Sequence, residues 1–245
     1  MDLRTELTER QIQLLRAIID EYSESSEPVG SKTVVRKYSL KVSPATIRND
    51  MAALLEDGFL EMMHTSSGRI PTAQAFRFFI EELMEEEEMP VLQEVAFKQR
   101  LWPQRYEFEK MLRNSVLSLA EATEHLALAI TNDGFMTTAG VSNILDSSEF
   151  WNIEVAKTAL DFLDRAETVE RIFSDLDKGQ EVTVAVGKEI GLPNMDHCAL
   201  VFAPFNTGKK VGYISIFGPA RMKYATVIPA VRYTSDLIEE LVSSW

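Results

Sequence analysis

The sequence predicts an α+β protein with a helical N-terminal domain that ends in a short hairpin, and a C-terminal domain in which helices flank a largely antiparallel sheet. Through residues 8–57, apolar residues recur at steps of three and four, the period of amphipathic helices. In the second half of the chain, β-rich runs alternate with helical ones, and residues 199–217 read as two strands joined by a hairpin. A mixture of helices and antiparallel strands defines the class.

A run of glutamates marks the expected boundary between the two domains. Six glutamates fall within residues 81–88, and Met89-Pro90 ends any helix there. We therefore expect a first domain over residues 1–88, a linker over 89–103 and a second domain over 104–245. A solvated helix end is the simpler interpretation of the glutamates, and an acidic docking surface is the alternative.

The first three helices have clear start signals. Thr8 is followed three residues later by Gln11, which is a capping box and places the first helix start at Thr8. A short second helix is expected over residues 31–38. Ser43-Pro44 combines an N-cap with proline at the first helical position, so a third helix should run from there to Asp57.

The third helix has one apolar stripe and one face of small or hydrogen-bonding residues. At 100° per residue the stripe contains Ile47, Met51, Leu54 and Leu55. The opposite side contains Ala45, Thr46, Asn49, Ala52 and Ala53. Small residues allow close approach to a DNA groove, asparagine can pair with adenine, and Arg48 on the flank can reach guanine or phosphate.

Charge supports the same interpretation locally. The net charge of the chain is -13, but residues 1–80 contribute little of it, with 10 basic and 11 acidic residues. Pro28 to Leu55 has a balance of +4, including Lys32, Lys41 and Arg48. A helix-turn-helix that binds DNA is the favoured hypothesis. The alternative is a three-helix packing unit with a solvated face.

A hairpin after the third helix has the features of a β-wing. Residues 59–63 read as a strand, 65–68 as a turn and 69–71 as a return strand. Its tip carries His64, hydroxyl groups and Arg69, which can contact phosphate or enter a minor groove. An ordinary surface hairpin is the alternative.

Composition excludes several function classes. One cysteine, Cys198, cannot form an intrachain disulfide, and neither a membrane span nor a secretory signal is recognisable, so we expect a cytoplasmic protein. The histidines are too dispersed to propose a zinc site, and His197-Cys198 reads as a strand-edge pair rather than a catalytic fragment. We expect no catalytic residues, no metal and no cofactor.

Three N-terminal stretches resemble the HrcA family of heat-inducible transcription repressors. They are Glu27-Pro28-Val29-Gly30-Ser31, Ser43-Pro44-Ala45-Thr46-Ile47-Arg48-Asn49-Asp50-Met51 and His64-Thr65-Ser66-Ser67-Gly68-Arg69-Ile70-Pro71-Thr72. A C-terminal stretch, residues 211–224, resembles the end of the same family.

The resemblance implies a winged-helix domain, a GAF-like sensor and dimerisation domain, and an inserted dimerising domain. It also implies a homodimer that binds an inverted-repeat operator called CIRCE before chaperone operons, and modulation by the GroEL chaperonin. By position in the motif, Ser43, Thr46, Arg48 and Asn49 would serve the recognition helix and Arg69 the wing. This chain is short between its GAF-like elements, so we expect the inserted domain to be missing or reduced.

A second hypothesis is a small-molecule sensor, because GAF-like folds often hold ligands that a winged helix would report. A ligand that binds only the native state raises the thermal stability of the protein as the ligand concentration grows. A thermal-shift screen therefore separates the sensor hypothesis from the repressor hypothesis.

Overall fold

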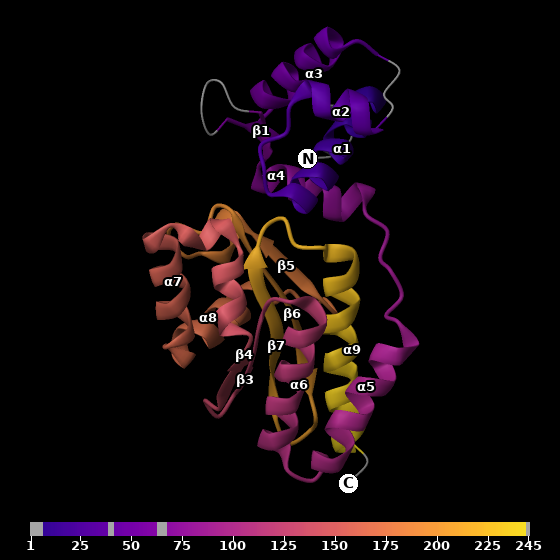
Figure 1. Ribbon diagram of the computed structural model, residues 1–245. Coiled ribbons are helices and arrows are strands. Elements are labelled where there is room, and N and C mark those ends of the chain that lie inside the picture. Colours follow the sequence, from indigo (N-terminus) through magenta and orange to yellow (C-terminus); the bar gives the residue numbers. More distant parts are fainter. Residues whose placement is uncertain (1–6, 39–41, 63–67, 244–245) are drawn as a thin grey trace. The chain divides into compact units, whose positions relative to one another are not determined.

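The structure is a computed structural model that describes residues 7–38, 42–62 and 68–243 of the 245-residue chain. Contacts within the chain divide it into two compact units, Met1–Glu85 and Glu86–Trp245. The α+β class predicted from the sequence is confirmed, with a mainly helical first unit and a sheet-containing second unit (Figure 1).

In its described residues the N-terminal unit contains three helices, a two-stranded hairpin and a final helical segment. In chain order these are α1 (Glu9–Ser25), α2 (Ser31–Tyr38), α3 (Pro44–Glu56), β1 (Leu60–Glu61), β2 (Ile70–Pro71), α4 (Ala73–Phe78) and η2 (Phe79–Leu83). The predicted capping box is present, because the Thr8 hydroxyl accepts from the Gln11 N–H and the Gln11 side chain accepts from the Thr8 N–H at 2.9 Å. These caps satisfy N–H groups that a helix start leaves unpaired.

The C-terminal unit has five helices, five strands and several short turns of helix among its described residues. They are α5 (Val91–Leu101), η3 (Trp102–Gln104), α6 (Phe108–Thr123), β3 (Leu126–Thr131), β4 (Met136–Ala139), η4 (Val141–Asp146), η5 (Ser148–Trp151), α7 (Ile153–Leu163), α8 (Ala166–Leu176), β5 (Thr183–Val186), η6 (Gly187–Ile190), β6 (Cys198–Asn206), β7 (Val211–Pro219) and α9 (Tyr224–Ser243).

The five strands form one antiparallel sheet in the order β4-β3-β7-β6-β5. The hairpin expected over residues 199–217 is confirmed, since β6 pairs with β7 from Cys198↔Pro219 to Asn206↔Val211. Helices α6 and α9 lie on one side of the sheet and α7 and α8 on the other (Figure 1). All six residues of β3 are buried, as expected for a strand covered on both faces.

Aromatic residues fill the core between the sheet and α7–α8. The ring of Phe173 lies 4.9 Å from that of Phe202, and the ring of Phe217 lies 5.7 Å from that of Phe150. Offset and edge contacts of this kind are the preferred geometries of aromatic pairs. This core holds the helical layer against β3, β6 and β7.

The segment expected as a linker, 89–103, is helical in the structure. It carries α5, whose Phe97 and Leu101 are buried beside α6 and α9, with the Phe97 ring 6.1 Å from that of Tyr233. The four-residue step between these apolar side chains allows both to face the same neighbours, which explains the helix.

The glutamate run is partly bound to the C-terminal unit. Glu86 accepts two hydrogen bonds from Arg232 of α9, and the Glu87 N–H donates to the carbonyl of Ala225 at 2.9 Å. In a regular helix the N–H of residue 229 would donate to the carbonyl of Ala225, four residues earlier. Residue 229 of α9 is proline and has no N–H, so this carbonyl is left available. A break in the helical hydrogen-bond ladder thus provides the acceptor that fixes Glu87.

Candidate nucleic-acid interface

Helix α3 begins as the sequence predicts. Ser43 is the N-cap, its Oγ accepts from the Thr46 N–H at 3.1 Å, and Pro44 occupies the first turn. The hydroxyls of Ser43 and Thr46 also lie 3.0 Å apart and are hydrogen-bonded to each other. The cap therefore fixes the two hydroxyls side by side at the N-terminal end of α3, where a helix attracts an anion such as phosphate.

The outer face of α3 carries the predicted contact residues. Arg48 and Asn49 are exposed, and so are Ala45 and Ala52 on the same side. The opposite face buries Ile47, Met51 and Leu54. The helix therefore presents an amide and a guanidinium between small side chains, an arrangement that can enter a major groove and form bidentate contacts to base edges.

An ion pair that the sequence analysis missed connects α3 to α1. Arg10 Nε donates to Asp50 Oδ2 at 2.7 Å, and Arg10 Nη2 donates to Asp50 Oδ1 at 2.9 Å. Asp50 is buried, and its hydrogen bonds and charge raise the pKa of Arg10. Because Arg10 compensates this carboxylate, Asp50 opposes the basic residues around it less than a charge count implies.

The basic residues of the approach to α3 differ in their surroundings. Lys32 on α2 is exposed, whereas Lys37 on the same helix lies 2.7 Å from Glu21 and 2.9 Å from Glu24. Hydrogen bonds to these carboxylates raise the pKa of Lys37. Lys32 is thus the better placed of the two for phosphate, and Lys41 lies outside the described residues.

The base of the wing is held against the loop before α2. Strands β1 and β2 pair antiparallel, and Arg69 and Val29 exchange backbone hydrogen bonds of 2.8 and 2.9 Å. A Cβ on Gly68 would lie 2.6 Å from backbone atoms of Pro28 and Val29, so this close approach requires glycine. The partly exposed Arg69 is thereby positioned at the base of the wing, while His64 lies outside the described residues.

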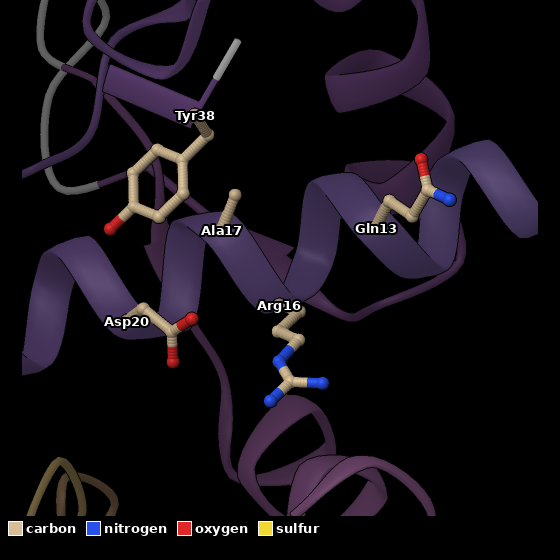
Figure 2. Close-up of a pocket in the computed structure, with 5 residues that line it drawn as sticks. All are labelled: Gln13, Arg16, Ala17, Asp20 and Tyr38. Atoms are coloured by element: carbon tan, nitrogen blue, oxygen red, sulfur yellow. The ribbon is translucent and has the colours of Figure 1, made fainter. Parts of the chain in front are cut away.

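A hollow on the surface of the same unit does not contain the residues predicted to bind DNA. Gln13, Arg16, Ala17 and Asp20 of α1 and Tyr38 of α2 line it (Figure 2). Burial raises the pKa of both Asp20 and Tyr38, the latter to about 12. At neutral pH the tyrosine therefore stays protonated, and its hydroxyl donates to Glu21 Oε2 at 3.4 Å.

Cys198 and His125 lie in the C-terminal unit and are not arranged for nucleophilic chemistry. Burial raises the pKa of the Cys198 thiol to about 12, so the thiol stays protonated at neutral pH. Burial and the charge of Arg221 lower the pKa of His125 to about 4. Within the described residues, no group of three or more His, Cys, Asp or Glu side chains could hold a metal ion, and no helix is long and apolar enough to cross a bilayer.

Comparison with protein families decides where this arrangement belongs. The family model described as "Winged helix-turn-helix transcription repressor, HrcA DNA-binding" matches residues 6–85, and the model "HrcA protein C terminal domain" matches residues 60–228. The chain belongs to the HrcA family. Together the two matches cover α3, the wing and all five strands of the C-terminal sheet.

Relatives in the HrcA family are named heat-inducible transcription repressors, a class of regulator and not of enzyme. The protein of Carboxydothermus hydrogenoformans is 26% identical over 340 positions, which cover 97% of this chain and 99% of the relative. The protein of Desulforudis audaxviator is 27% identical, and the alignment covers 93% of this chain and 95% of the relative. Both alignments exceed the 245 residues of this chain, so these HrcA relatives contain residues that it lacks, as expected for a shortened member.

A solved structure supports the fold. A crystal structure described as a hypothetical protein at 2.2 Å resolution is 21% identical, with a TM-score of 0.80 and coverage of 98% of this chain and 99% of that one.

Proposed function

We propose that this chain is a sequence-specific transcription repressor of heat-shock chaperone genes, in which α3 reads an operator in the major groove. The observation that carries the proposal is the exposed face of α3, where Arg48 and Asn49 lie between Ala45 and Ala52 in a domain that the HrcA DNA-binding model matches. Ser43, Thr46, Lys32, Lys41 and Arg69 serve phosphate or groove contacts around it.

The operator is an inverted repeat, which a homodimer binds with one recognition helix in each half. Helix-turn-helix dimers place their recognition helices about 34–36 Å apart, or a multiple of this, because the same groove face recurs once per turn. The family resemblance supports a CIRCE-like repeat and modulation by a GroEL-type chaperonin. Its place of action is the cytoplasm, where the operator DNA lies.

The test is fluorescence anisotropy with a labelled inverted repeat and a scrambled duplex of equal length. Arg48→Ala and Asn49→Ala should each weaken specific binding by about tenfold or more, since a bidentate base contact is worth ~1–3 kcal/mol. Lys37→Ala is the matched control, because it removes a positive charge from the same basic segment at a side chain already paired with Glu21 and Glu24.

Equal binding to the repeat and the scrambled duplex would refute the proposed repressor function. Unchanged specific binding by both α3 variants would refute the assignment of the recognition helix. Adding purified chaperonin at two temperatures tests the modulation separately, with a change in the amount of operator-competent protein as the expected result.

A further inference from the structure

Asp50 is a buried acid in the middle of the proposed recognition helix. It follows Arg48 and Asn49 directly in the chain, and both of those residues are exposed, whereas the Asp50 side chain is only 10% exposed. A helix turns by about 100° per residue, so Asp50 lies next to Asn49 around the α3 axis, on the side that faces the core. Any rotation of α3 that moves Asp50 therefore moves Asn49 through the same angle.

The other buried side chains of α3 are apolar. Ile47, Met51 and Leu54 are each 4% exposed or less. The hydrophobic effect is non-directional, so their burial determines which side of α3 faces the core more closely than it determines the angle of the helix about its axis. Side chains at a binding site must be held within about 10–20° of the productive geometry. A directional contact between α3 and a neighbouring element narrows the angle to such a range.

Arg10 of α1 makes a directional contact of this kind. Its Nε and Nη2 donate to the two different carboxylate oxygens of Asp50, at 2.7 and 2.9 Å. A planar guanidinium that binds both oxygens of a carboxylate fixes the angle between the two groups as well as their distance. Arg10 lies in the first turn of α1, where the capping box of Thr8 and Gln11 fixes the start of the helix. The angle of α3 is therefore set against a helix with a defined start.

Neither stability nor attraction to DNA accounts well for Asp50. Burying a carboxylate costs desolvation energy, and apolar side chains of similar size are often as stabilising as a buried ion pair, or more so. Asp50 is also the one acidic residue from Pro28 to Leu55, so it weakens the attraction of this basic segment for phosphate. Orienting α3 is a role that an apolar residue at this position could not fill.

We propose that Arg10 and Asp50 are positioning residues for operator recognition. Their bidentate ion pair sets the rotation of α3 about its axis and thereby directs Arg48 and Asn49 at the base edges. Neither Arg10 nor Asp50 needs to contact a base for this. The proposal rests on the proposed function and deepens it, because it names the contact that fixes the angle at which the recognition helix reads DNA.

Two single variants of the full chain separate positioning from simple charge. Asp50→Asn removes a negative charge and Arg10→Ala a positive one, so electrostatics alone predicts tighter binding to any duplex for the first and weaker binding for the second. Positioning predicts that both lower the ratio of operator affinity to scrambled-duplex affinity, by about tenfold, because a bidentate base contact is lost. Arg16→Ala, which removes an exposed cation from α1, should leave the ratio unchanged. Wild-type ratios in both Asp50→Asn and Arg10→Ala would overturn the proposal.

An apolar replacement separates positioning from folding. Arg10→Met combined with Asp50→Leu fills similar space without a directional contact, and its free energy of unfolding should equal or exceed that of the wild type. Stoichiometric titration at high operator concentration measures the fraction of binding-competent protein, which should be unchanged while the preference for the operator falls. A double variant that keeps the wild-type preference would show that the ion pair does not set the angle.

A double-mutant cycle tests whether the pair acts through the recognition face. When Asn49→Ala is already present, Arg10→Ala should lower the operator preference by less than it does in the wild type, because residues that act as one unit are not additive. Fully additive losses would assign Arg10 its own contact with the operator and would overturn the positioning role.

The orientation of α3 can also be measured without DNA. Residual dipolar couplings of the α1 and α3 amides in the full chain report the angle between the two helices. In Asp50→Asn we expect α3 to remain helical but to change its orientation relative to α1. Wild-type couplings in this variant would overturn the positioning role. A wild type that binds operator and scrambled duplex equally would instead refute the proposed function, and the couplings would still decide the positioning.

Discussion

Arg232 binds Glu86 through two hydrogen bonds, of 2.6 and 3.0 Å, between residues 146 positions apart in the chain. Arg232 lowers the pKa of Glu86 through these bonds. Both side chains are partly exposed, so the pair should contribute about 1 kcal/mol or less to stability. Its main effect is to hold the first residues of the C-terminal unit on α9.

Arg232→Gln should therefore change local protection more than global stability. We expect faster hydrogen exchange at the Glu87 amide, whose acceptor is the carbonyl of Ala225, and a small change in the urea midpoint. The stabilisation is present above the ordinary glutamate pKa and lost as pH falls through the lowered value. Lys188→Gln, at an exposed pair with Asp196, is the control, and unchanged Glu87 exchange in Arg232→Gln would contradict the prediction.

The ion pair between Arg10 and Asp50 should matter more for the N-terminal unit. Arg10→Ala leaves a buried carboxylate without its cation, so we expect a lower free energy of unfolding. Asp50→Asn should cost less, because it removes the charge and keeps a hydrogen-bond acceptor. Far-UV circular dichroism must follow this unfolding, since all three tryptophans lie beyond residue 101. Arg16→Ala, exposed on the same helix, should have little effect.

Gly68→Ala should disrupt the base of the wing. The added Cβ would meet backbone atoms of Pro28 and Val29 at 2.6 Å, and no side-chain rotation relieves a backbone contact. We expect at least ~2 kcal/mol of destabilisation and weaker operator binding, measured by thermal unfolding and anisotropy. Gly30→Ala is the matched control two residues from Pro28, where nothing lies within 4 Å of the added Cβ. Equal effects of the two variants would show that this contact is unimportant.

Lys32→Ala should weaken operator binding and scrambled-DNA binding to a similar degree. A phosphate contact carries no sequence information, and its loss lowers the slope of log K against log salt by about 1. A titration at several salt concentrations measures this slope. If Lys32→Ala instead changed the preference between duplexes, the side chain would contact a base.

Acid should destabilise the C-terminal unit through His125. Its pKa is about 4 in the folded unit and 6.5 ordinarily, so between these values the unfolded chain binds a proton that the folded chain does not. Stability is therefore complete above pH 6.5 and declines as pH falls towards 4, by up to about 3 kcal/mol. Tryptophan fluorescence in urea at pH 7 and 4.5 measures the decline. It should be smaller in His125→Asn and unchanged in the exposed His197→Asn.

Local signals in the sequence predicted much of the N-terminal unit. Thr8 with Gln11, and Ser43 with Pro44, have their effect within one helical turn, so a sequence pattern is enough to recognise the caps. The burial of Ile47, Met51 and Leu54 followed equally from helical periodicity.

Contacts between distant residues could not be predicted in the same way. The Arg10–Asp50 pair joins residues 40 positions apart. The sequence alone shows Asp50 only as the one acidic residue in the basic segment Pro28 to Leu55, with no partner indicated. The expected linker over 89–103 contains α5 for a related reason, since Phe97 and Leu101 reveal their role only when α6 and α9 are in place beside them.

The strand order of the sheet also determines when the C-terminal unit can become complete during synthesis. Strand β7 lies between β3 and β6, yet it is the last of the five strands to leave the ribosome. Until then the β3–β4 hairpin and the β5–β6 pair are separate fragments with no shared partner. The N-terminal unit, by contrast, is a compact unit within Met1–Glu85, and domains generally fold as units, N-terminal first during synthesis. The nascent chain can therefore fold the unit that carries α3 well before the sheet closes.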